Sequence, residues 1–210
     1  MVQRYATEAK RYDCGLIWLP HLDAGFYEVA NEHYDDSYFD HYAALEHLPI
    51  SDQIIDARLK LVERHTTGRL LDFGIGSGTF IRHRSETVGF DINEKSVAWL
   101  NERGLYVDPW ATISHAVTFW DSIEHVRDFA PLLANIQEWV FISIPIFSDA
   151  QHVLRSKHFK PAEHYWYFTP HGLAQLMRDH GFLAIEVNHD ETNLGREDIM
   201  SFAFKREHAR

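Results

Sequence analysis

Short apolar runs and segments of helical periodicity alternate along most of this 210-residue chain. Runs too short for a helix predict buried strands, whereas segments with apolar residues three and four apart predict helices. The strands are expected at residues 70–73, 87–91, 105–107, 116–120, 139–146, 182–188 and 198–205. Strands separated by helical stretches are typical of an α/β fold with a parallel sheet. Residues 51–210 are therefore expected to form one domain around a mostly parallel sheet, with helices on both faces. The seven apolar runs predict a sheet of seven strands.

Capping and stop signals set the bounds of the predicted helices. A helix over residues 51–67 is expected to start at a cap on Ser51 or Asp52. The clearest helix starts at the N-cap Thr169, and Gly181 ends it. Shorter helices are expected at residues 79–84, from Asn93 to Gly104, and at residues 128–137.

The first 50 residues are aromatic-rich and have the least regular pattern of the chain. Over residues 25–48 the spacing is loosely helical, with Phe26 and Tyr34 on one stripe. We interpret residues 1–50 as an N-terminal lid whose aromatic side chains pack on the domain. The alternative is that part of the lid lines a substrate pocket, the candidates being Tyr38, Phe39 and Tyr42.

Glycines at alternate positions follow the apolar run at residues 70–73, namely Gly74, Gly76 and Gly78. The pattern predicts a strand, a tight turn and the start of a helix. Glycine accepts positive φ and lets a ligand approach the backbone closely. Asp91 ends the next predicted strand, where a carboxylate can accept hydrogen bonds from both hydroxyls of a ribose. Together these features predict a nucleoside-binding site.

The glycine spacing narrows the class of nucleoside. A dinucleotide fingerprint needs glycine where Thr79 stands, and the Gly-Lys-Ser/Thr of a P-loop is absent. The spacing Asp72-x-Gly-x-Gly-x-Gly instead resembles motif I of class I S-adenosylmethionine (SAM)-dependent methyltransferases. The resemblance implies that SAM is the cofactor. It also implies that Asp72 organises the contact with the amino group of its methionine end, while Asp91 holds its ribose.

The resemblance covers roughly residues 50–205. Residues 117–125 look like the fourth-strand motif of the subgroup that contains the ubiquinone-biosynthesis O-methyltransferases, and residues 164–169 and 181–182 resemble its final third. The resemblance implies a Rossmann-like methyltransferase fold and SAM-dependent transfer of a methyl group to an oxygen or nitrogen of a small-molecule acceptor. Two alternatives are an RNA or DNA methyltransferase and a non-catalytic SAM-binding module.

The family pattern extends the expected cofactor site along the strand ends. Asp108 falls where the family contacts the adenine, and Trp110 can stack on the ring, the alternative being that Trp110 belongs to the core. Trp120 and Asp121 are expected near the sulfonium. The full set of expected cofactor contacts is Asp72, Phe73, Gly74, Ile75, Gly76, Gly78, Asp91, Ile92, Asp108, Trp110, Trp120 and Asp121.

Methyl transfer from a sulfonium is an in-line displacement, so the protein has to align the acceptor and remove its proton. The candidate catalytic residues are Glu124, His125 and His164. His125 is a possible base, and with Glu124 it also suits a brace for the loop. His164, on the loop after the fifth strand, suits either a base or a structural hydrogen bond. Related O-methyltransferases bind magnesium at a pattern resembling Asp121, Glu124 and His125. A further acidic ligand is missing near Phe129, so no metal is predicted.

Composition limits the partners and the compartment. The formal net charge of −11 argues against a broad grip on nucleic acid, which needs Lys and Arg against phosphates. The longest apolar run is far short of the roughly 20 residues that cross a bilayer, so no membrane is expected. The single cysteine, Cys14, fits a reducing compartment, and no signal-peptide pattern precedes it. The sequence therefore predicts a cytoplasmic enzyme.

Overall fold

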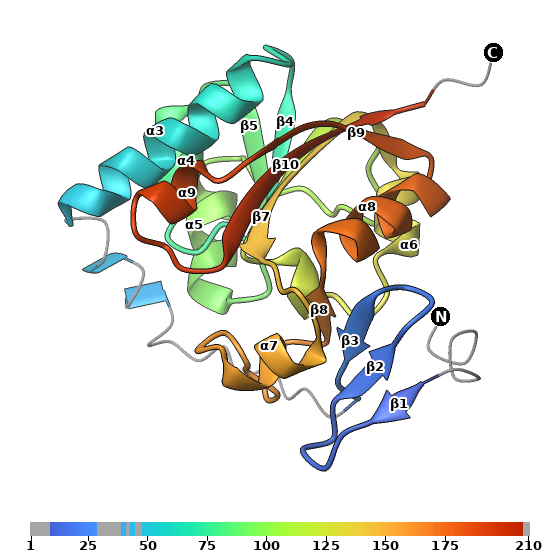
Figure 1. The fold of residues 1–210 in the computed structure, drawn as a ribbon. Coiled ribbons are helices and arrows are strands. Elements are labelled where there is room, and N and C mark those ends of the chain that lie inside the picture. Colours follow the sequence, from blue (N-terminus) through green and yellow to red (C-terminus); the bar gives the residue numbers. More distant parts are fainter. Residues whose placement is uncertain (1–8, 29–38, 41–42, 45–47, 208–210) are drawn as a thin grey trace.

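The computed structural model describes residues 9–28, 39–40, 43–44 and 48–207, and a six-stranded sheet forms the centre of this part (Figure 1). Its strand order is β5-β4-β6-β7-β10-β9. Strands β5, β4, β6 and β7 run parallel, whereas β10 is antiparallel to both of its neighbours. The strands are β4 (Leu70–Phe73), β5 (Thr87–Phe90), β6 (Ser114–Trp120), β7 (Ile136–Pro145), β9 (Phe182–Asn188) and β10 (Ile199–Arg206). The predicted α/β fold with a mostly parallel sheet is confirmed.

Helices cover both faces of this sheet because its strands are apolar on both sides. Leu70 belongs to the core cluster that includes residues of α3 (Pro49–Glu63) and Phe80 of α4 (Thr79–His83), whereas its neighbour Leu71 belongs to the cluster that includes residues of α6 (Ala130–Ala134) and α8 (Pro170–Asp179). Successive strand residues point to opposite faces, so a continuous apolar run predicts two covered faces. The remaining helices are α5 (Glu94–Glu102), the 3₁₀ helix η2 (Ile123–His125), α7 (Ala150–Arg155) and α9 (Asp190–Asn193).

Residues 105–107 do not form the predicted seventh strand, since the sheet of the described residues has six strands. The segment forms only an isolated bridge between Tyr106 and Gly89. Two backbone hydrogen bonds hold it, from Gly89 N to Leu105 O at 2.9 Å and from Val107 N to Gly89 O at 3.0 Å. The run is too short for more, because Gly104 has a φ of 63° before it and Pro109 follows soon after.

Part of the N-terminal segment forms strands, of which only the last, Ala24–Phe26, overlaps the helical stripe predicted for residues 25–48. β1 (Lys10–Arg11), β2 (Ile17–Leu19) and β3 (Ala24–Phe26) form a second sheet with β8 (Trp166–Phe168), in the order β1-β2-β3-β8. Phe26 therefore lies on a strand and packs edge-on against Trp166, with 4.8 Å between ring centroids. Phe39 is half-buried. The other residues of the predicted stripe and pocket lie outside the described residues, namely Tyr34, Tyr38 and Tyr42.

The predicted helix starts at Thr169 and Asn93 are confirmed by side-chain caps. Thr169 accepts a hydrogen bond from Gly172 N at 3.0 Å, and Asn93 accepts from Lys95 N and Ser96 N. The predicted caps Ser51 and Asp52 are wrong, because α3 starts after Leu48 with Pro49 in its first turn. Proline lacks the N–H that a cap would satisfy. Helices α7 and α9 were not predicted, and no helix of the described residues is long and apolar enough to cross a bilayer.

Candidate functional site

The glycine turn joins β4 to α4 at the carboxyl edge of the parallel strands. Gly74, Gly76 and Gly78 have φ angles of 80°, 55° and 81°, in the left-handed region that favours glycine. A Cβ on Gly74 would lie 2.8 Å from Cβ of Ser122, closer than such atoms approach. The backbone geometry and this close approach explain why the positions carry glycine.

Asp91 follows the last residue of β5 and is 6% exposed. Its Oδ2 accepts a hydrogen bond from Gly76 N at 3.1 Å, and its Oδ1 accepts from Asn93 N at 2.8 Å. Burial raises the pKa of this carboxyl, and the backbone hydrogen bonds act in the opposite direction. Asp91 therefore connects the glycine turn to the end of the neighbouring strand.

Two cavities flank the glycine turn, and both reach Gly74 and Asp121. Cavity A, of about 280 Å³, is lined by Phe73, Gly74, Phe90, Asp91, Ile92, Trp110, Asp121, Ser122, His125, Val126, Arg127 and Asp128. Cavity B, of about 220 Å³, is lined by Ser51, Ile54, Ile55, Arg58, Asp72, Gly74, Ile75, Gly76, Ser77, Thr79, Phe80, Trp120, Asp121 and Arg196. An elongated ligand with two different ends can therefore lie across Gly74.

Cavity A has an aromatic wall. The Trp110 ring meets the rings of Phe90 and Phe73 edge-on, with centroid distances of 5.0 Å and 5.8 Å. Trp110 is 43% exposed, so the alternative that it is a core residue is wrong. Asp108 lies outside the residues that line cavity A, and its Oδ1 accepts from Trp110 N at 2.9 Å. Trp110 is thus free to present a ring face, and Asp108 shapes the turn that carries it.

Cavity B is polar at its inner end. Asp72, on β4, is 1% exposed, and its Oδ1 accepts a hydrogen bond from Thr118 Oγ1 at 2.7 Å. Burial raises the pKa of Asp72 to about 7, despite this hydrogen bond and the positive charge of Arg58. The guanidinium of Arg58 also lies over the ring of Trp120, 5.0 Å from its centroid.

Two arginines and two carboxylates form a charge cluster beside cavity B. Glu191, from α9, is 1% exposed and accepts from Arg58 Nε at 2.8 Å, from Ser143 Oγ at 2.7 Å and from Arg196. The Oδ2 of Asp121 accepts from Arg58 Nη2 at 3.2 Å and from Arg196 Nη2 at 2.8 Å. Burial alone would raise the pKa of Glu191, but the two arginines lower it to about 2. Glu191 is therefore ionised at neutral pH.

Arg58, Arg196 and Glu191 were not predicted from the sequence. Arg58 stands on the apolar stripe of α3, four residues after Ile54, and a cation on such a stripe needs a buried partner. That signal was available for Arg58. Arg196 and Glu191 follow β9 on a short helix and loop with no motif, so only the tertiary structure reveals them.

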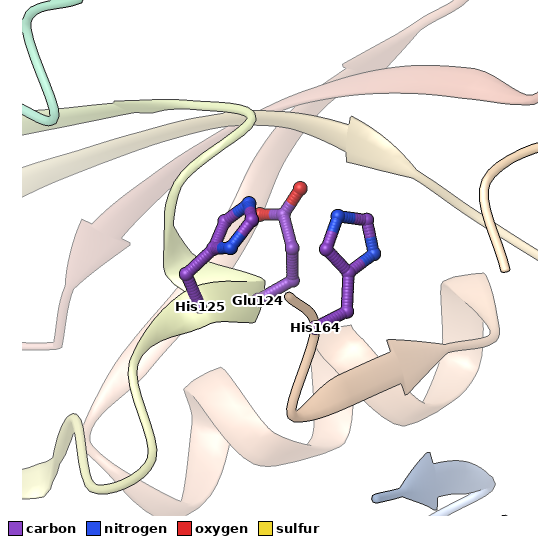
Figure 2. Close-up of side chains that lie close together, drawn as sticks. All are labelled: Glu124, His125 and His164. Carbon is purple, nitrogen blue, oxygen red and sulfur yellow. The ribbon is translucent and has the colours of Figure 1, made fainter. Parts of the chain in front are cut away.

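The three candidate catalytic residues, Glu124, His125 and His164, lie close together, although the sequence placed them on two separate loops (Figure 2). One ligand atom of each lies within 4.8 Å of the others. Glu124 is 2% and His164 is 4% exposed, whereas His125 is half-buried and lines cavity A. A backbone hydrogen bond of 2.9 Å from Tyr165 N to Glu124 O joins the two segments. Asp121 is not part of this set, because its carboxylate is bound by the two arginines.

The protonation of this set follows from its burial. Neither oxygen of Glu124 has a hydrogen-bond partner among the described residues, and burial raises the pKa of its carboxyl well above the usual value. Burial lowers the pKa of His164 well below its usual value, and that of His125 is lowered for the same reason. His125 Nδ1–H donates to Glu163 O at 2.9 Å, so this tautomer carries its lone pair on Nε2.

A family model described as a methyltransferase domain matches residues 41–187, which is more than half of the chain. The chain belongs to this methyltransferase family. The match confirms the predicted methyltransferase, but does not reach the subgroup of the ubiquinone-biosynthesis enzymes. No curated protein matches the chain.

Solved structures with the same fold include three methyltransferases. The magnesium protoporphyrin IX methyltransferase of Synechocystis PCC 6803, with bound S-adenosylhomocysteine (SAH), is 14% identical, with a TM-score of 0.61 over 83% of this chain and 96% of that one. A SAM-dependent methyltransferase of Thermotoga maritima, a possible histamine N-methyltransferase, is 14% identical, with a TM-score of 0.58 over 81% of this chain and 97% of that one.

The third is the 1,6-didemethyltoxoflavin-N1-methyltransferase of Burkholderia thailandensis, with bound SAH and 1,6-didemethyltoxoflavin. It is 13% identical, with a TM-score of 0.56 over 96% of this chain and 100% of that one. At these identities the three structures establish a shared fold. The expected Rossmann-like methyltransferase fold is therefore confirmed.

Proposed function

We propose that the protein transfers a methyl group from SAM to an oxygen or nitrogen of a small-molecule acceptor. The observation that carries the proposal is the pair of cavities that meet at Gly74. Cavity A offers a buried carboxylate and aromatic rings, as a nucleoside requires, and cavity B offers a carboxylate and two arginines, as an amino acid requires. SAM joins these two chemical groups through its sulfonium, and it supplies an electrophilic methyl group when bound.

Asp91 and Trp110 are the residues proposed to hold the adenosine in cavity A. Asp91 accepts from Gly76 N and Asn93 N, one on each oxygen, and the ribose hydroxyls are proposed to donate to the same two oxygens. Trp110 is proposed to stack on the adenine from the rim, and Ile92, which is 53% exposed, lies next to the ribose acceptor.

Asp72, Arg58 and Arg196 are proposed to hold the amino-acid end in cavity B. Each guanidinium has five N–H donors, so both arginines can donate to a carboxylate while bound to Glu191 and Asp121. Asp72 then pairs with the ammonium group. Since Gly74 and Asp121 line both cavities, the sulfonium is expected near them.

The acceptor is proposed to approach on the His125 side of cavity A, where a proton can be removed. His125 is the member of the catalytic set that lines the cavity, and Glu124 and His164 lie buried behind it. The lid formed by residues 1–50 and the ubiquinone-biosynthesis subgroup remain predictions. The proposal of a small-molecule acceptor is supported by the solved neighbours, whose named substrates are small molecules.

Titration calorimetry and radiolabel transfer test this function together. We expect SAM and SAH to bind with one site per chain, and tritium from methyl-labelled SAM to enter a small-molecule extract. Labelling of RNA or DNA with steep salt dependence would support the nucleic-acid alternative instead. Binding without transfer to any extract would support a non-catalytic module, and absence of binding at millimolar SAM and SAH would reject all three.

The affinity for SAH is expected to rise with pH up to about 7 and then level off, because the ammonium group pairs with ionised Asp72. The raised pKa of about 7 leaves this carboxyl partly protonated at lower pH, so binding there has to release a proton. Calorimetry at several pH values, in buffers of different ionisation enthalpy, measures both effects. Asp72→Asn should bind weakly and lose the proton release, whereas a wild-type affinity that is flat below pH 7 would contradict the assignment.

A further inference from the structure

The set of Glu124, His125 and His164 has a property that a base alone does not explain. Glu124 is 2% exposed, yet both of its oxygens lack a hydrogen-bond partner among the described residues. Figure 2 shows its carboxylate between the two imidazole rings. Buried polar groups are normally hydrogen-bonded, since an unpaired one costs roughly 1–3 kcal/mol. A ligand that binds carboxylate and imidazole at once would satisfy it.

We propose that Glu124, His125 and His164 hold a divalent transition-metal ion such as Zn²⁺ or Fe²⁺. The set combines one carboxylate oxygen with two imidazole nitrogens, which suits these ions better than Mg²⁺ or Ca²⁺, whose ligands are oxygens. The hydrogen bond from His125 Nδ1–H to Glu163 O fixes the tautomer that ligates through Nε2, as carbonyl partners do for histidine ligands.

The distances allow this site with small movements. Two ligand atoms on one Zn²⁺ ion lie about 3.4 Å apart, given bonds of about 2.0–2.1 Å in tetrahedral geometry. The ligand atoms of this set lie within 4.8 Å of one another. Side-chain rotations that move these atoms by roughly 1 Å therefore bring them to the separation that one ion requires. Three protein ligands leave the fourth position open, and His125 lines cavity A.

Asp121 lies outside the proposed ligand set. Its carboxylate accepts from Arg58 and Arg196. The metal site therefore differs from an oxygen-rich set of Asp121, Glu124 and His125, since an imidazole from another segment takes the third place. The inference concerns binding of the ion alone and does not depend on methyl transfer; while an ion is bound, His125 Nε2 is a ligand and does not act as the base.

Metal titration of the full chain tests the site without SAM. Protein stripped with EDTA is titrated with Co²⁺, a spectroscopic probe of Zn²⁺ sites, and with Zn²⁺ by calorimetry. We expect one ion per chain, visible Co²⁺ absorption bands, and no displacement by excess Mg²⁺. Glu124→Gln and His164→Ala should each weaken Co²⁺ binding at least about 100-fold, beyond the range seen for loss of second-shell partners. Asp121→Asn removes a nearby charge but no ligand, so it should weaken Co²⁺ binding much less than either of these variants.

Matched controls separate this site from the other histidines, of which the chain has fifteen in all. His152→Ala, which removes the partner of Asp198 at 3.2 Å, should leave Co²⁺ binding unchanged. X-ray absorption of Zn²⁺-loaded wild type needs no variant and should detect two imidazoles and oxygen. Absence of stoichiometric binding, equal binding by the Glu124 and His164 variants, or an all-oxygen coordination shell would overturn the proposal. None of these results would affect cofactor binding in cavities A and B.

Discussion

Replacing Asp91 with alanine is expected to weaken SAH binding roughly 100-fold. Its two oxygens are the proposed acceptors for the ribose hydroxyls, and hydrogen bonds to a charged group contribute about 1.5–3 kcal/mol each. Part of that loss is recovered by water, so a total near 3 kcal/mol, or roughly 100-fold in affinity, is expected. Titration calorimetry of both proteins with SAH at pH 8 measures the difference.

Asp91 also accepts from Gly76 N and Asn93 N, so a structural effect needs a control. Asp91→Asn keeps the shape and one acceptor but places its amide NH2 against one of the two backbone N–H groups, so it should give an intermediate affinity with a lower melting temperature than the wild type. Asp108→Ala removes a carboxylate at the rim, outside cavity A, and should change affinity less than tenfold. Unchanged SAH affinity in folded Asp91→Ala would reject the ribose assignment.

The confirmed structural predictions concern features within one strand-turn-helix-strand unit. The glycine spacing, Asp72 and Asp91 lie within 20 residues, and the right-handed crossover between parallel strands places them at one edge. Their positions therefore follow from local pattern and a general rule of topology. The cap at Thr169 also depends only on its own helix.

The features that were missed depend on contacts between distant segments. β3 pairs with β8 over more than 140 residues, and its three-residue strand has no periodicity long enough to be recognised. The direction of the Asp121 side chain depends on Arg196, which no local pattern predicts. The proximity of His164 to Glu124 likewise depends on the Tyr165 backbone hydrogen bond.

Replacing Glu191 with alanine is expected to lower the free energy of unfolding by about 3–5 kcal/mol at pH 7, because removing one partner leaves buried charges uncompensated. Glu191 is 1% exposed, and Arg58, Arg196 and Ser143 all donate to it. Denaturant unfolding of the two proteins measures the difference. We also expect weaker SAH binding, since Glu191 positions both arginines of cavity B.

Glu186→Ala is the matched control, because its carboxylate also has a pKa of about 2 and pairs with Arg64. Its side chain is 24% exposed and that of Arg64 is 44% exposed, so water screens the pair and the expected loss is at most about 1 kcal/mol.

Because the pKa of Glu191 is lowered from 4.5 to about 2, its stabilisation is complete above pH 4.5 and is lost as the pH falls through 2. The difference between wild type and Glu191→Ala should therefore narrow with acidification. A loss no larger than that of Glu186→Ala would mean that Glu191 does not organise the arginine cluster.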